Sequence, residues 1–172
     1  MSATAQLTFA EFEQLPDQPG KRELIEGKVI EMPPPLDNHT LTAQAFLFLL
    51  AGALGWRRVR MEGGYKIGEN WVQPDLSVTW PDQSHERGYL AGAPMLAIEI
   101  LSEHKSARQV QKKLDLYLRN GAKEVWTVSR SERSITVFRQ DEAGTQTSTR
   151  VTDEYTPDWL GLAIRPAELI IP

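Results

Sequence analysis

The chain contains no cysteine, which excludes disulfide bonds, cysteine-ligated zinc or iron–sulfur centres and a cysteine nucleophile. It also lacks the run of about 20 apolar residues that a membrane-spanning helix requires, because its longest strongly apolar stretch covers only residues 45–56. Residues 1–15 contain neither a basic segment nor an apolar one, so no signal peptide is expected. Together these absences predict a cytoplasmic protein.

Positive charge is not in excess either. The sequence has 19 Lys and Arg against 23 Asp and Glu, a formal net charge of −4, which argues mildly against nucleic-acid binding. The charge is unevenly distributed, since residues 103–124 carry more basic than acidic side chains. This segment is either a solvated helix face or a basic side of the protein. No P-loop, dinucleotide-binding glycine pattern or nucleophile elbow is present.

The length of 172 residues predicts one domain over residues 1–172. A hairpin is expected over 22–31, a helix capped by Asn38 and ending near Leu54, and a second long helix over 103–119. Strands are expected over 57–67, 71–80, 95–102, 124–129, 134–140 and 145–151. This order predicts an α/β fold with one mixed sheet flanked by helices and an added N-terminal hairpin. Apolar residues surround more than one face of the first long helix, which predicts that it is enclosed against the sheet.

Three residues break the local patterns. Glu99 lies inside an apolar strand, Asp75 shares a strand side with Ser77 and Thr79, and Lys113 lies on the apolar stripe of its helix. Two acids and a lysine are typical of a site in which carboxylates bind Mg²⁺ and the lysine positions water or binds phosphate charge. The alternative is a buried ion pair in which Lys113 neutralises Glu99 and Asp75 only sits at a strand end.

Several short motifs, taken in their order and spacing, resemble the Uma2 family. These are RELIEG at 22–27, the proline run at 33–35, His39, QPD at 73–75, AIEILS at 97–102, KLDLY at 113–117 and NGAKEVW at 120–126. Members of this family are described as restriction endonucleases within the PD-(D/E)XK nuclease superfamily. The resemblance covers roughly residues 23–139.

The resemblance implies a restriction-endonuclease-like αβββαβ core. It also implies a Mg²⁺ or Mn²⁺ ion held by Asp75, Glu99 and the backbone carbonyl of Ile100. Lys113, from the helix that follows, is then the catalytic lysine, and Glu23 matches a family acid that joins the site.

Two positions depart from the family pattern. Leu101 stands where the superfamily places its lysine, and Gln109 replaces a family aspartate. His39 matches a family position near the start of the first long helix, where a polar residue beside the cap is the preferred interpretation.

The function that the resemblance implies is that of a metal-dependent endonuclease acting on DNA, and a homodimer is expected. Arg108 and Lys112 could contact the phosphate backbone. The alternative is a non-catalytic binding or assembly module of the same fold with a structural carboxylate–lysine cluster, which the net negative charge and Gln109 favour. A metal-dependent phosphohydrolase acting on a small substrate is a third possibility.

Overall fold

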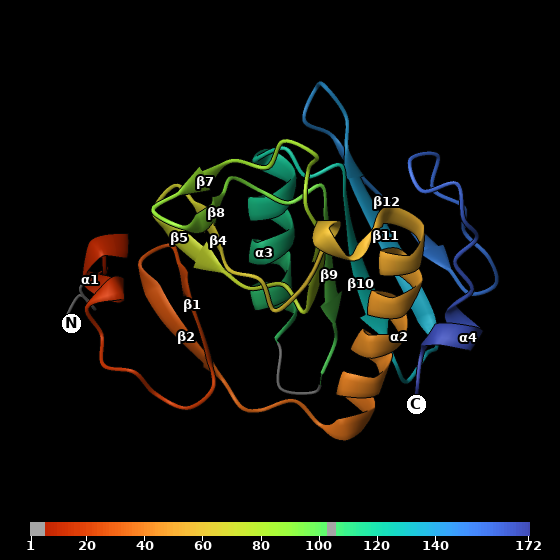
Figure 1. The fold of residues 1–172 in the computed structure, drawn as a ribbon, viewed down its shortest axis with the longest axis horizontal. Coiled ribbons are helices and arrows are strands. Elements are labelled where there is room, and N and C mark those ends of the chain that lie inside the picture. Colours follow the sequence, from red (N-terminus) through yellow and green to blue (C-terminus); the bar gives the residue numbers. More distant parts are fainter. Residues whose placement is uncertain (1–5, 103–105) are drawn as a thin grey trace.

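The computed structural model describes residues 6–102 and 106–172, and its strands form two six-stranded mixed sheets (Figure 1). The first sheet has the order β2-β1-β5-β4-β8-β7, with β1 at Lys21–Ile25, β2 at Lys28–Met32, β4 at Tyr65–Ile67, β5 at Asn70–Val72, β7 at His85–Glu86 and β8 at Tyr89–Ala91. The second sheet has the order β12-β11-β10-β9-β6-β3, with β3 at Val59–Met61, β6 at Leu76–Val78, β9 at Leu96–Ile100, β10 at Glu124–Ser129, β11 at Ser134–Gln140 and β12 at Gln146–Val151. The helices are α1 at Phe9–Glu13, α2 at Asp37–Leu54, α3 at Ala107–Arg119 and α4 at Pro166–Leu169, with a 3-10 turn, η1, at Trp56–Arg58.

The predicted αβββαβ core is present as α2, β3, β6, β9, α3 and β10, so the predicted fold class is confirmed. Strand β9 pairs antiparallel with β6 and parallel with β10, and α3 makes the crossover that a parallel pair requires. This arrangement makes β9 a central strand, with a paired neighbour on each side.

Strands β11 and β12 extend the core sheet, but β1, β2, β4, β5, β7 and β8 form a separate sheet, which differs from the single sheet expected from the sequence. The strand predicted over 57–67, with a break expected near Gly63 and Gly64, is divided there, and its two halves, β3 and β4, join different sheets. The predicted strand over 71–80 is likewise divided into β5 and β6 at Pro74, which cannot donate a ladder hydrogen bond. The N-terminal β1–β2 hairpin turns at Glu26 and Gly27, both with positive φ, and completes the first sheet.

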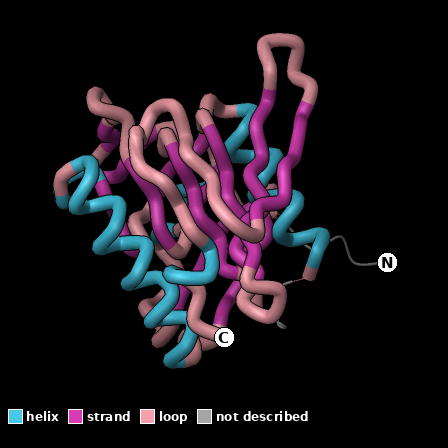
Figure 2. The backbone as a smooth tube through the Cα atoms, turned by 90° about the vertical axis from the view of Figure 1, so that its right-hand side faces the viewer, coloured by secondary structure: helices cyan, strands magenta, loops and turns pink. Residues whose placement is uncertain are grey.

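Helices α2 and α3 lie on opposite faces of the second sheet (Figures 1 and 2), and each packs in its own apolar cluster. On one face, Phe46 and Leu50 of α2 pack against Ile98 of β9. On the other face, α3 lies between the two sheets, and Leu114 and Tyr117 pack in a cluster that also contains Ile25, Tyr65, Ala97 and Val125. Because side chains alternate along a strand, Glu99 faces the α3 side while Ile98 and Ile100 face α2.

Helix α2 differs from its prediction in two respects. Its N-cap is Leu36, not Asn38, whose side-chain Nδ2 instead donates to the carbonyl of Pro172. The expectation that α2 is enclosed was also wrong, because only one side packs on the sheet and Phe48 on the other side is 74% exposed. None of the helices within 6–102 and 106–172 is long and apolar enough to cross a bilayer.

Helix α3 begins at Ala107, behind the N-cap Ser106. The side chain of Ser106 accepts from the backbone N–H of Gln109, and the side chain of Gln109 accepts from the backbone N–H of Ser106. The predicted start of this helix, Glu103, lies outside the described residues. The capping box fixes the start of the helix, and the helical period then places Lys113 on the same buried side as Leu114 and Tyr117.

Candidate active site

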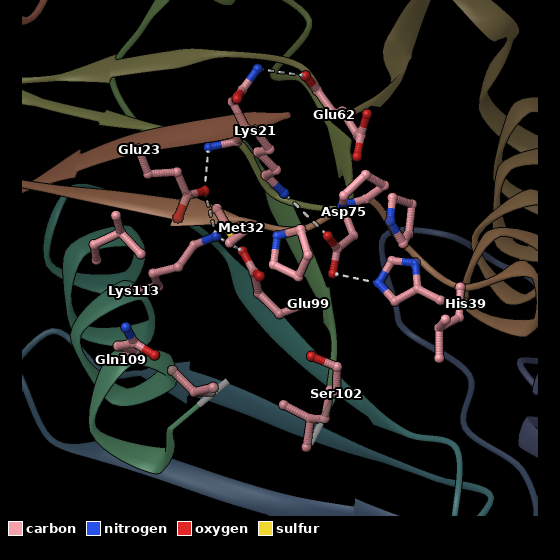
Figure 3. A pocket seen from close by; sticks show the side chains of 18 of the residues that line it. Lys21, Glu23, Met32, His39, Glu62, Asp75, Glu99, Ser102, Gln109 and Lys113 are labelled. Carbon is pink, nitrogen blue, oxygen red and sulfur yellow. Dashed lines mark hydrogen bonds and ion pairs between the residues drawn. The ribbon is translucent and has the colours of Figure 1, made fainter. Parts of the chain in front are cut away.

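A cavity of about 1000 Å³ lies at the carboxyl end of β9, bounded by β1, α3 and the start of α2. Its wall contains the charged residues Lys21, Glu23, His39, Asp75, Glu99 and Lys113, which Figure 3 shows together. All six are well shielded, with side-chain exposures between 1% and 12%. The carboxyl ends of adjacent parallel strands are a common position for ligand sites in α/β sheets.

Lys113 connects the two sheets through two carboxylates. Its Nζ lies 2.7 Å from Oε1 of Glu23 on β1 and 2.5 Å from Oε1 of Glu99 on β9. The three residues are at most 5% exposed, so the charges are compensated by one another more than by solvent. The ammonium is thereby held next to a carboxylate that faces the cavity.

Tyr117, one helical turn after Lys113, supports the same carboxylate. Its hydroxyl donates to Oε1 of Glu99 at 3.2 Å. Burial, reinforced by the negative charges of Glu99 and Glu23, raises the pKa of Tyr117 well above 10. The phenol therefore remains a neutral hydrogen-bond donor at physiological pH.

Asp75 precedes β6 and is held by partners from three elements. Its Oδ2 accepts from the backbone N–H of Ile100 at 2.7 Å and lies 3.4 Å from Nε2 of His39 on α2. Its Oδ1 lies 3.1 Å from Nζ of Lys21 on β1. Because the N–H and C=O of a strand residue point to the same side of the strand, the carbonyl of Ile100 also faces the Asp75 side.

The donor set suits a hard divalent cation. Asp75 and Glu99 offer carboxylate oxygens and Ile100 a carbonyl oxygen, which are the ligand types that Mg²⁺ and Mn²⁺ prefer. Over residues 6–102 and 106–172, no group of three or more His, Asp or Glu side chains could hold a metal. These residues therefore fit a site in which two carboxylates hold the ion and water and substrate oxygens supply the other ligands, as is usual for Mg²⁺.

The structure brings together Glu23, Asp75, Glu99 and Lys113, and it places Ile100 beside Asp75. The two residues proposed from the sequence to contact phosphate lie elsewhere, because neither lines the cavity. Arg108 is exposed on α3. Lys112 forms an ion pair with Glu26 in the β1–β2 turn, and its hydrogen bond lowers the pKa of Glu26.

Sequence reasoning did not select Lys21 and gave His39 no catalytic role, yet both contact Asp75. The signal for Lys21 was available in the alternation of β1, since Lys21 and Glu23 share a side with Ile25, which is buried. His39 lies in the first turn of α2, and only the packing of that helix against Asp75 brings its ring into the cavity. Gln109 also lines the cavity while it completes the cap of α3.

Comparison with known proteins agrees with this fold. The family model described as "Uma2: Putative restriction endonuclease" matches residues 9–165. A solved structure, described as a "putative nuclease belonging to DUF820 from Anabaena variabilis ATCC 29413", superposes with a TM-score of 0.83 at 24% sequence identity. The match covers 95% of this chain and 97% of the other, and at this identity it establishes the shared fold. A search of curated proteins finds no match. Because the family model extends over most of the sequence and the core has the order it requires, this chain belongs to the Uma2 family.

Proposed function

We propose that the protein is a metal-dependent endonuclease that hydrolyses phosphodiester bonds in DNA. The observation that carries the proposal is the convergence of Asp75, Glu99 and Lys113 in one cavity at the carboxyl end of β9. The description of the family as restriction endonucleases and that of the structural neighbour as a nuclease support the same chemistry.

In this proposal Asp75, Glu99 and the carbonyl of Ile100 hold Mg²⁺ or Mn²⁺. When bound, such an ion lowers the pKa of a water molecule and stabilises the charge on the leaving oxygen. Lys113, held by Glu23 and Glu99, orients the attacking water or neutralises charge that develops on the phosphate. Glu23 is a positioning residue, because its Oε1 accepts from both Lys113 and the backbone N–H of Gln73.

The decisive experiment measures cleavage of plasmid and single-stranded DNA with Mg²⁺ or Mn²⁺. Wild-type protein should cleave, EDTA should stop the reaction, and Asp75→Asn and Lys113→Met should each reduce the rate by at least about 100-fold. Lys123→Met, at an exposed position beyond the same helix, is the matched control and should leave the rate unchanged. Equal rates in all four proteins would overturn the mechanism.

A second candidate, a non-catalytic module of the same fold, is favoured by one observation. Both carboxylates that face Lys113 share its ammonium as an ion-pair partner, as a structural cluster requires. Calorimetric titration separates the two functions. Absence of binding at millimolar Mg²⁺ or Mn²⁺ would support the module and contradict the nuclease.

We further propose that the protein acts on DNA in the cytoplasm as a homodimer, because cleavage of both strands is often achieved by two sites related by a two-fold axis. The outer face of α2 offers a surface for pairing. Leu41 and Phe48 lie seven residues apart on this face and are 43% and 74% exposed, and Trp56, just beyond the helix, is 73% exposed.

A further inference from the structure

Two residues of the cavity contain buried polar atoms that lack a hydrogen-bond partner. Within the described part of the chain three such side-chain atoms occur, and two of them, Nε of Arg130 and Oδ1 of Asn38, belong to residues that line the cavity. A buried donor without an acceptor is costly and uncommon. Because Nε is closed off from the cavity, a ligand there would contact the terminal Nη groups of Arg130, for which the described residues supply no hydrogen bond or ion pair.

Arg130 directly follows β10. It lies at the same end of the parallel strands as Glu99 and Asp75, the carboxylates proposed to bind the metal. Strands β9 and β10 run parallel with Val128 opposite Ile100, and the backbone N–H of Leu101 donates to the carbonyl of Val128 at 2.9 Å. A turn in which the N–H of Arg133 donates to the carbonyl of Arg130 holds the backbone. The start of the β10–β11 loop is therefore a rigid part of the cavity wall.

The residues on either side of Arg130 are serines, and the next acid along the loop, Glu132, pairs with Arg150. Ser129 and Ser131 also line the cavity, and their hydroxyl oxygens lie 3.4 Å apart. Three other arginines in this half of the molecule pair with an acid, namely Arg139 with Glu124, Arg150 with Glu132 and Arg165 with Glu154, whereas Arg133 donates to the carbonyl of Ala167. Over the residues that the structure describes, no such carboxylate pairs with Arg130. A guanidinium on the same loop as two serine hydroxyls supplies donors for the oxygens of a phosphate.

We propose that Arg130, with the hydroxyls of Ser129 and Ser131, binds a phosphate of the DNA strand adjacent to the phosphate that is cleaved. The inference rests on the proposed function, because the carboxylates and Lys113 define where the scissile phosphate would lie. It assigns the loop after β10 to substrate binding, in place of the exposed basic face of α3.

The test is the salt dependence of duplex DNA binding, measured in EDTA so that no cleavage occurs. Arg130→Met should weaken binding roughly tenfold and reduce the slope of log K against log salt concentration by about 0.9, the value for one lost phosphate contact. Arg130→Lys should retain the slope. Arg150→Met, which removes an exposed arginine from β12, is the control and should change neither quantity.

The outcomes separate this inference from the proposed function. Wild-type protein that binds DNA with an Arg130-dependent slope but never cleaves it upholds the phosphate site and overturns the nuclease. Cleavage by wild-type protein, with Arg130→Met binding as tightly and with the same slope, overturns the phosphate site alone. Absence of any DNA binding by wild-type protein also overturns it. Melting temperatures check folding, and Arg130→Gln serves as a second neutral variant if Arg130→Met does not fold.

Discussion

The ammonium of Lys113 lies 2.7 Å from Oε1 of Glu23, although 90 residues separate the two along the chain. One belongs to the helix between the sheets and the other to the first strand of the N-terminal hairpin. Their contact attaches the hairpin to the core at the point where Lys113 also meets Glu99. Because the cluster is buried, removing Lys113 would leave both carboxylates uncompensated, whereas removing Glu23 would leave Lys113 paired with Glu99.

The first prediction concerns this pair. Lys113→Met should lower the free energy of unfolding by about 3 to 5 kcal/mol, since it leaves Glu23 and Glu99 buried without their cation. A double-mutant cycle with Glu23→Gln should give a coupling energy of about 1 to 3 kcal/mol, measured by urea unfolding. Strictly additive effects would show that the contact between Lys113 and Glu23 contributes nothing to stability.

The second prediction concerns metal binding. Mg²⁺ or Mn²⁺ should raise the melting temperature of wild-type protein, because a ligand at ten times its dissociation constant stabilises the folded state by about 1.4 kcal/mol. Asp75→Asn should abolish this increase, and EDTA should reverse it. Scanning calorimetry with each ion provides the measurement. An equal increase in Asp75→Asn would place the bound ion elsewhere on the protein.

The third prediction tests whether Lys21 competes with a metal ion for Asp75 or has only a structural role. Because Nζ of Lys21 lies 3.1 Å from Oδ1 of Asp75, it competes electrostatically with any cation at that carboxylate. Lys21→Met should therefore bind Mn²⁺ several times more tightly in a calorimetric titration, as expected when a like charge is removed. Lys28→Met, at an exposed position in the same hairpin, is the control. Weaker binding by Lys21→Met would contradict this interpretation.

Alkaline pH should destabilise the protein through its buried tyrosines. Burial raises the pKa of Tyr65 to about 12, against the effect of its hydrogen bond with Ser77. The unfolded chain ionises near pH 10, so the stability that Tyr65 contributes is fully present below about pH 10 and is lost as the pH rises to about 12. The loss, about 2 to 3 kcal/mol, should be smaller in Tyr65→Phe. Unfolding free energies that stay constant up to pH 12 would refute the prediction.

The fifth prediction concerns the outer face of α2. If this face forms the proposed homodimer, Phe48→Glu should convert the dimer to a monomer without lowering the melting temperature, because Phe48 is 74% exposed within one chain. Light scattering coupled to size-exclusion chromatography measures the mass. A monomeric wild-type protein, or a dimer that survives Phe48→Glu, would exclude this surface.

Much of the fold and part of the site follow from local patterns. The alternation of the strand over 96–100 places Glu99 on the opposite side from Ile98, and the helical period places Lys113 with Leu114 and Tyr117 on the buried side. These periodicities are properties of the backbone and need no distant partner. The interruptions at Gly63 and Pro74 are likewise visible in the sequence, although their consequence, a second sheet, is not.

The amino-acid sequence by itself determined the order of the core elements, the burial of Glu99 and Lys113, and the tight turn of the first hairpin. Only the tertiary structure decided their partners. It paired Lys113 with Glu23, paired Asp75 with Lys21 and His39, excluded Arg108 and Lys112 from the cavity and added Arg130 to it. The reason is physical, because pairing between strands and docking of helices depend on contacts between residues distant along the chain, which no local period encodes.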